Sequence, residues 1–197
     1  MSLRLRLATP ADGPRCAEIY APAVQSMLSV ELTPPDGAEM TRRIGETLAQ
    51  KPWLIAEDEM VLGFAYSGPH RVRPAYAWSA ETTIYVAPEA HRRGVGKALY
   101  TSLFAILALQ GYQNLIAGIT VPNPPSREFH LSMGYEPIGI YRKVALKRGV
   151  WLDLEWFQKS LGNHPADAPA PRTLPAVSRT PEFGLAIGSA LRVPGSS

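Results

Sequence analysis

The chain is organised around residues 81–100, which read Glu81-Thr82-Thr83-Ile84-Tyr85-Val86-Ala87-Pro88-Glu89-Ala90-His91-Arg92-Arg93-Gly94-Val95-Gly96-Lys97-Ala98-Leu99-Tyr100. Its β-branched and aromatic beginning predicts a strand that stops at Pro88. A loop with basic side chains and two glycines then leads into an apolar-periodic helix. Glycines let a backbone approach a pyrophosphate, and free N–H groups at a helix start attract anions. The stretch therefore indicates a phosphate-bearing cofactor, and a plain strand-to-helix turn with solvated arginines is the alternative.

The loop departs from two common phosphate-binding motifs. His91 stands where a Walker loop has its first glycine, and Ala98 replaces the Ser or Thr that would hold magnesium. Leu99 occupies the third glycine position of the dinucleotide fingerprint. These departures exclude nucleoside triphosphates and dinucleotides as ligands of this loop, and we expect no metal site.

Composition narrows the class of protein. The 197 residues, 46% of them hydrophobic, fit one domain. A net charge of +3, without aromatic residues interleaved in long basic runs, gives no indication of a nucleic-acid partner. Cys16 is the single cysteine, and no apolar run reaches membrane-spanning length. We therefore expect a cytoplasmic protein with no membrane partner.

The order of hydrophobic periods predicts a mixed α/β (α+β) domain in residues 1–160. The expected strands are 3–7, 53–57, 60–66, one containing Glu81, 115–121, 137–145 and 150–157. The expected helices are one through Cys16 that pauses near Pro22, one from 36 or 37 to 48, one at 95–110, and one begun by Asn123. Residues 161–197 contain six prolines and no sustained period, so we expect a mostly disordered tail that can be removed after Ser160 without loss of activity.

Several runs resemble the GNAT superfamily of N-acetyltransferases, and within it the phosphinothricin and methionine sulfoximine N-acetyltransferases. The similarity covers residues 3–158. Its most specific runs are Pro52-Trp53-Leu54-Ile55-Ala56, Gly63-Phe64-Ala65-Tyr66-Ser67-Gly68-Pro69, Ala75-Tyr76-Ala77-Trp78 continuing to Val86, Leu99-Tyr100-Thr101, and Gly149-Val150-Trp151-Leu152-Asp153. The resemblance implies a GNAT fold, acetyl-CoA as cosubstrate, a small amino-acid substrate and a homodimer.

The resemblance also implies a cofactor site. The superfamily loop Gln/Arg-x-x-Gly-x-Gly/Ala falls on residues 91–96, with His91 in place of the usual first residue and expected to act mainly through its backbone. This loop is expected to hold the pyrophosphate, and the backbone of the preceding strand the pantetheine arm. The implied cofactor-binding residues are Ile84, Tyr85, Val86, His91, Arg92, Arg93, Gly94, Val95, Gly96, Asn123 and Ser126.

Amine acetylation needs a base, because an amine is mostly ammonium at neutral pH. Glu81 is the only carboxylate on the strand before the glycine loop, and His130 lies seven residues after Asn123 on one helix face. We expect Glu81 to deprotonate the amine, His130 to donate to the leaving sulfur or share in deprotonation, and a backbone N–H of residues 84–86 to stabilise the oxyanion. A solvated glutamate and a packed histidine are the ordinary alternatives.

The resemblance places the substrate in the loop before Glu81. Arg71, Arg73 and Tyr76 would meet the acidic end of the amino acid, with Thr83 lining the pocket. Val30, where the family favours Phe, and Leu152, where some relatives carry His, depart from the pattern.

Two other functions remain open. One is acetylation of a peptide N-terminus or another amine, and the other is a non-catalytic acyl-CoA-binding module. The presence of both Glu81 and His130 argues against the second.

Overall fold

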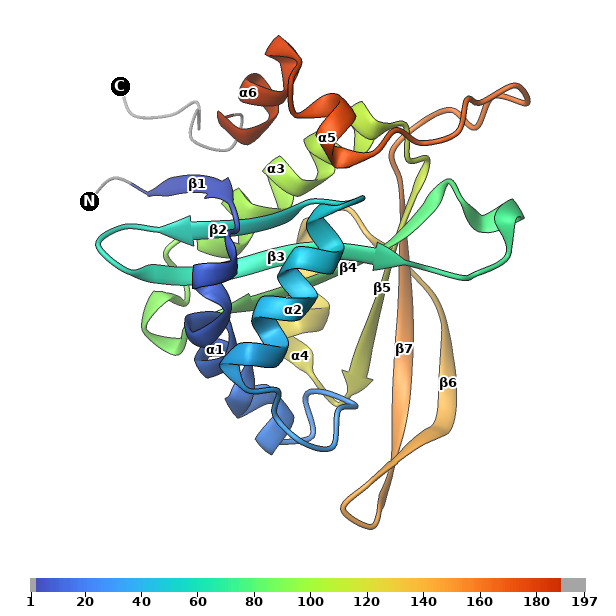
Figure 1. Cartoon of the computed structure of the whole chain (residues 1–197). Coiled ribbons are helices and arrows are strands. Elements are labelled where there is room, and N and C mark those ends of the chain that lie inside the picture. Colours follow the sequence, from blue (N-terminus) through green and yellow to red (C-terminus); the bar gives the residue numbers. More distant parts are fainter. Residues whose placement is uncertain (1–2, 189–197) are drawn as a thin grey trace, which may run out of the picture.

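The computed structural model describes residues 3–188, which form a seven-stranded sheet in the order β1-β2-β3-β4-β5-β7-β6 (Figure 1). The strands are β1 Arg4–Leu7, β2 Trp53–Glu57, β3 Val61–Pro69, β4 Ser79–Val86, β5 Asn114–Val121, β6 Glu136–Lys147 and β7 Val150–Ser160. Neighbouring strands are antiparallel except β4 and β5, which are parallel. The expected mixed sheet is confirmed.

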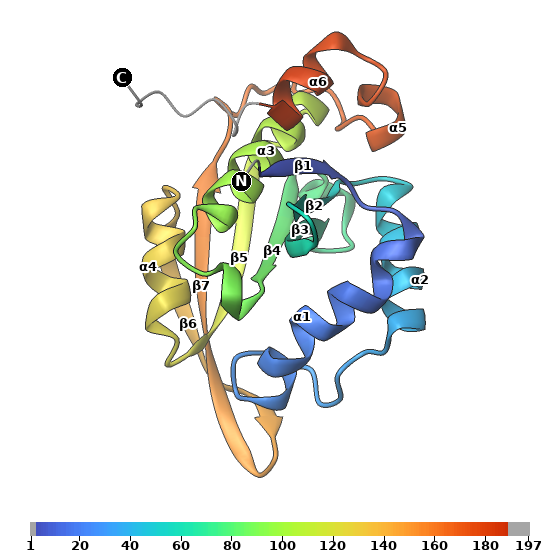
Figure 2. The ribbon, with the colours of Figure 1, turned by 90° about the vertical axis from the view of Figure 1, so that its left-hand side faces the viewer.

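Helices cover both faces of the sheet (Figure 2). Helices α1 Gly13–Gln25 and α2 Gly37–Leu48 lie on one face, and α3 Val95–Gln110 and α4 Pro124–Ser132 on the other. Short 3-10 helices occupy Pro10–Asp12, Pro74–Tyr76 and Pro88–Ala90. Helix α1 continues through Pro22 to Gln25, where the sequence predicted a pause. No helix within residues 3–188 is long and apolar enough to span a membrane.

Local signals set the helix ends as the sequence predicted. The Asp36 carboxylate accepts a hydrogen bond from the Glu39 backbone N–H and caps α2. Gly111, with φ of 100°, ends α3 in the left-handed conformation that glycine adopts without strain. The Asn123 side chain caps α4 by accepting from the Ser126 N–H at 3.3 Å.

Strands β6 and β7 form a long hairpin that runs past the end of β5. Arg148 and Gly149 connect the strands, and both have positive φ, which suits a tight two-residue turn. Near this turn the Lys147 ammonium is buried and donates to the backbone carbonyls of Val24 and Ser29, at 2.7 and 2.6 Å. The hairpin is thereby fixed to the end of α1 and to the loop that follows it.

The expectation of a disordered tail is wrong for residues 161–188. They pack along α3 and form α5 Leu174–Val177 and α6 Pro181–Gly188 (Figures 1 and 2). The buried Gln110 amide donates to the carbonyls of Gln50 and Arg172, which holds this segment to the domain. Apolar side chains close the contact: Leu174, Val177, Phe183 and Ala186 are at most 8% exposed. Two short helices bury too few residues each to show a period, although together they cover α3. Residues 189–197 of the expected tail lie outside the described part.

Candidate active site

Strands β4 and β5 separate in the middle of the sheet. They pair over three residue pairs, the last being Glu81 with Ile116. Beyond that point β4 stays paired with β3 as far as Val86, and β5 stays paired with β7 as far as Val121. We call this divergence the β4–β5 fork; Figure 1 shows the two halves of the sheet running in different directions. Beyond Glu81, no strand within residues 3–188 pairs with the edge of β4 that faces β5. Residues 82–86 therefore leave an edge that an extended ligand can join as an added strand.

The loop after β4 ends at a helix start that suits an anion. No side chain in the described part of the protein caps α3 at Gly94, and the first turn of α3 carries no acidic residue. The positive end of the helix dipole is therefore not neutralised by the helix's own side chains. Gly94 has φ of 79°, and an added Cβ would meet no atom within 4 Å, so the backbone conformation is what requires glycine. At Gly96 a Cβ would come within 3.2 Å of the Phe129 ring of α4.

The basic side chains of this loop point to different partners. His91 donates from Nε2 to the carbonyl of Val86 at 3.0 Å, so its imidazole, and not only its backbone, contacts the end of β4. Arg93 lies 3.8 Å from the Asp58 carboxylate in the β2–β3 turn. Arg92 has φ of 60° and is exposed. The structure brings residues 91–96 together as one turn but directs Arg93 toward the β2–β3 hairpin.

Alternate residues of β4 face opposite helical layers. Tyr85 packs on Tyr20 of α1, with ring centroids 4.4 Å apart, so Glu81, two pleats away, belongs to the α1/α2 face. Ile84 points the other way, toward Gly96 of α3. The Thr82 hydroxyl also lies on the α3/α4 face. Glu81 faces the α1/α2 layer, whereas His130 belongs to the α3/α4 layer. The structure therefore does not place the two side chains on the same side of β4.

Glu81 has a partner that the sequence did not assign to the site. The Nδ1 atom of His70, which follows β3, lies 2.9 Å from Glu81 Oε1. The two side chains are 15% and 37% exposed, so the pair lies at the protein surface and remains accessible. No local sequence signal indicates this contact, because it depends on the antiparallel pairing of Gly68 with Glu81, which sets His70 diagonally across from Glu81 on the same face.

His130 is buried between α3 and α4, and its ring nitrogens both have partners. Nδ1 lies 2.8 Å from the Ser126 carbonyl, which can only accept, so Nδ1 carries the proton. Nε2 then accepts from the Tyr100 hydroxyl at 3.1 Å. The Tyr100 hydroxyl oxygen also lies 3.5 Å from Thr82 Oγ1. Tyr100 thereby connects His130 to the α3/α4 face of β4. Burial lowers the pKa of His130, although the Ser126 hydrogen bond acts in the opposite direction.

The lowered pKa of His130 predicts a loss of stability on acidification. The unfolded chain takes up this proton below about pH 6.5, whereas the folded chain resists it, so the stability that the neutral ring contributes is present above that pH and lost below it. In urea titrations at pH 7.5 and 5.0, we expect His130→Gln to show a smaller fall in the free energy of unfolding than the parent chain. The exposed His164 supplies the control, His164→Gln, which should fall as the parent does. An equal fall in all three proteins would contradict a depressed pKa at His130.

The four residues expected from the sequence to bind the substrate do not all lie next to Glu81. Tyr76 meets the His70 ring edge-on at a centroid distance of 5.9 Å. Arg71 donates to the Tyr141 hydroxyl of β6 at 3.4 Å. Thr83 shares the face of Glu81 and pairs with Tyr66 of β3. Arg73 precedes the Pro74–Tyr76 turn and is exposed. Tyr76 and Thr83 thus lie beside the Glu81–His70 pair, whereas Arg71 contacts Tyr141. Among residues 3–188, no contact places Arg73 near the pair.

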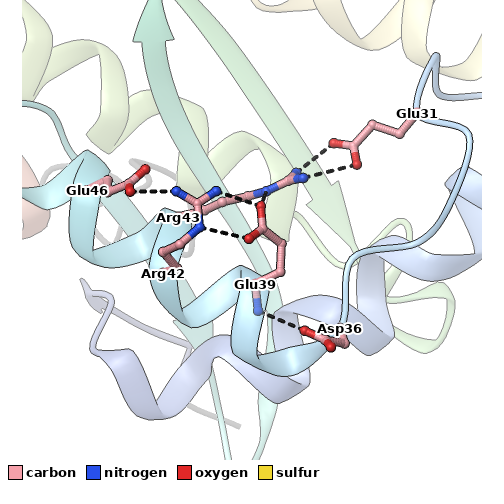
Figure 3. Close-up of polar contacts among 6 residues, drawn as sticks. All are labelled: Glu31, Asp36, Glu39, Arg42, Arg43 and Glu46. Atoms are coloured by element: carbon pink, nitrogen blue, oxygen red, sulfur yellow. Dashed lines mark hydrogen bonds and ion pairs between the residues drawn. The ribbon is translucent and has the colours of Figure 1, made fainter.

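The loop between α1 and α2 is tied to its surroundings on the α1/α2 face. The Tyr20 hydroxyl bonds the Ser29 hydroxyl at 2.7 Å, and Arg43 of α2 donates to the Glu31 carboxylate at 2.6 Å. Arg43 also contacts Glu39, which extends the network along α2 (Figure 3). Val30 stands between these two anchors and is 47% exposed. The loop is therefore fixed on both sides of the position that departs from the family pattern.

Cys16 is fully buried in α1, and burial raises the pKa of its thiol to about 12. A thiol in this state is a poor nucleophile. No group of three potential metal ligands occurs among the described residues.

The family profile of the acetyltransferase (GNAT) domain matches residues 5–156. This match, together with the mixed sheet and its β4–β5 fork, defines the class of protein as an acyltransferase. The chain belongs to the GNAT family of acetyltransferases. The expected GNAT fold is thereby confirmed.

Sequence similarity to named proteins extends over most of the chain. A phosphinothricin N-acetyltransferase of Streptomyces viridochromogenes is 33% identical over 171 residues, covering 86% of this chain and 91% of the relative. An L-methionine sulfoximine/L-methionine sulfone acetyltransferase of Salmonella typhimurium is 28% identical over 83% of this chain and 98% of the relative. A solved GNAT superfamily phosphinothricin acetyltransferase of Sinorhizobium meliloti, in complex with AcCoA, has a TM-score of 0.80 and 34% identity, covering 91% of this chain and 100% of that one.

Proposed function

We propose that this chain transfers the acetyl group of acetyl-CoA to the amino group of a small amino acid with an acidic or tetrahedral side-chain group, such as phosphinothricin or methionine sulfoximine or sulfone. The divergence of β4 and β5 directly after Glu81 carries the proposal, because it sets an unpaired strand edge beside a carboxylate. The family membership and the named relatives support it. The cytoplasm, where the single free cysteine would stay reduced, is the proposed location.

The chain's own groups fit acetyl-CoA. The edge formed by residues 84–86 would pair with the pantetheine arm, and the turn at residues 91–96, with the uncapped start of α3, would hold the pyrophosphate. Asn123 and Ser126 open α4 and would meet the pantetheine end. When bound, acetyl-CoA supplies an activated thioester.

Glu81 is the proposed base. It would take a proton from the substrate ammonium, so that the amine nitrogen can attack in a ternary complex without a covalent acyl-enzyme. A backbone N–H of residues 84–86 would stabilise the negative charge on the carbonyl oxygen. His130 is proposed to serve proton transfer at the leaving sulfur from the α3/α4 side of β4. It would act through the Tyr100 hydroxyl at Nε2, because its Nδ1 proton is held by the Ser126 carbonyl. Arg71, Arg73, Tyr76 and Thr83 remain the proposed substrate contacts, with Arg71 suited to a carboxylate or phosphinate.

Gly94→Ala tests the cofactor site. Alanine disfavours the left-handed conformation by about 1–2 kcal/mol, so the free loop would relax away from it and acetyl-CoA binding would have to restore it. We therefore expect the Kd for acetyl-CoA to rise about tenfold in isothermal titration calorimetry. Gly45→Ala is the matched control, since Gly45 is exposed in α2 and a Cβ there also meets no atom within 4 Å. Equal affinity of the two variants would contradict the assignment of the loop.

We propose that two copies associate through the β6–β7 hairpin. Its apolar side chains are exposed by 42–56%, namely Ile138, Ile140, Tyr141, Val144, Leu146, Val150 and Trp151. Exposed apolar side chains on an edge hairpin are suited to burial against a second copy of the same hairpin.

Light scattering tests the dimer. We expect a mass of about twice the chain mass of 21.5 kDa, reduced toward one chain by Trp151→Glu. Leu185→Glu, at an apolar residue of α6 that is 64% exposed, should leave the mass unchanged. A single-chain mass for the parent protein would contradict the proposal.

A further inference from the structure

His70 makes the one side-chain hydrogen bond that the structure gives to Glu81 within residues 3–188. Its Nδ1 lies 2.9 Å from Glu81 Oε1, and the imidazole is 15% exposed. The residue directly opposite Glu81 on β3 is Gly68, which has no side chain, and the diagonal position belongs to His70. The β3–β4 register thus leaves the space beside the carboxylate to His70.

Two aromatic rings from separate elements fix the His70 imidazole. Tyr76, in the turn before β4, meets it edge-on at 5.9 Å, and Trp156 of β7 meets it edge-on at 6.2 Å. Trp156 is itself seated over Gly118 of β5, where an added Cβ would come within 3.2 Å of the indole. Because Trp156 is held by the fold and Tyr76 contacts the same imidazole, the ring has a defined orientation toward Glu81.

The direction of this hydrogen bond follows from the chemistry of the two groups. An ionised carboxylate only accepts, so Nδ1 carries the proton and donates it to Oε1. The donation engages one oxygen and restricts the rotation of a flexible glutamate side chain, which otherwise keeps substantial rotamer freedom. The second oxygen is left to accept a proton from an amine.

We propose that His70 is a positioning residue that orients the Glu81 carboxylate for deprotonation of the substrate amine, an inference that rests on the function proposed above. His70 does not take the substrate proton. It donates through Nδ1 throughout, while the proton leaves the amine for the free oxygen of Glu81. One ammonium proton stays on the amide, one reaches the thiolate and one is released to solvent.

Three variants of the full chain test this role by steady-state kinetics with acetyl-CoA and phosphinothricin. His70→Phe keeps a ring between Tyr76 and Trp156 but removes the donor, and should lower kcat about tenfold with the amine KM changed less than about twofold. His70→Asn keeps an N–H donor near the position of Nδ1 and should restore most of the rate. His164→Phe, at an exposed histidine whose Nε2 contacts Asn114, is the control and should retain the parent rate.

A double-mutant cycle separates positioning from mere packing. In a Glu81→Gln background, His70→Phe should cause little further loss, because a positioning residue acts only through the group that it positions. An additive loss, a KM effect with unchanged kcat, or a parent-like His70→Phe enzyme would overturn the proposal while leaving a working acetyltransferase. A parent chain without acetyl transfer would instead overturn the proposed function, and the positioning role with it.

Discussion

Glu81→Gln is expected to lower kcat at least about 100-fold, the usual contribution of a general base. Glutamine has the shape of glutamate and can still accept from His70 Nδ1, but it takes no proton from an ammonium group. The Kd for acetyl-CoA should stay within about twofold of the parent value, because the loop at residues 91–96 is untouched. Steady-state kinetics and titration calorimetry on the same preparation measure both quantities.

Glu136→Gln is the matched control for that experiment. Glu136 lies on β6 of the same sheet, is exposed, and should tolerate the same change without loss of rate. Turnover of Glu81→Gln equal to that of the control would remove Glu81 from the role of base.

Truncation after Ser160 is expected to destabilise the fold severely. The cut removes four side chains that are buried against the domain, Leu174, Val177, Phe183 and Ala186, and the carbonyl that accepts from the buried Ser102. Loss of a single buried Leu or Phe side chain costs about 2–5 kcal/mol, so the sum rivals the total stability of about 5–15 kcal/mol for a typical domain. Thermal unfolding should show a much lower Tm, or aggregation at expression.

A second truncation, after Gly188, keeps every contact that the structure describes for α5 and α6. Its Tm should lie well above that of the Ser160 truncation. A Ser160 truncation with the same Tm as this control would show that α5 and α6 contribute nothing to the fold.

The elements of the domain were predictable from sequence because each depends on local chemistry. Asp36 and Asn123 cap their helices, and Gly111 ends α3. The packed segment 161–188 was not predictable in this way. Its helices are short, and their stability comes from contact with α3, which no local pattern reports.

The candidate site also combines relations that the sequence could predict with relations that only tertiary packing creates. Glu81 and the glycine loop stand next to each other in the chain, so the sequence could join them. The Glu81–His70 contact depends on the β3–β4 register, and the separation of Glu81 from His130 depends on which helices cover each face. The contact of Arg93 with Asp58 likewise requires the position of a distant hairpin. These relations arise from tertiary packing, and residue spacing does not encode them.

The most direct test of the proposed function is thiol release from acetyl-CoA by the purified full chain, measured with a panel of amines. The panel contains phosphinothricin, methionine sulfoximine, methionine sulfone, common amino acids and short peptides. We predict that kcat/KM for phosphinothricin or a methionine sulfoximine-type substrate exceeds that for any peptide by at least about tenfold. Release with peptides alone, or acetyl-CoA binding without release for any amine, would contradict it.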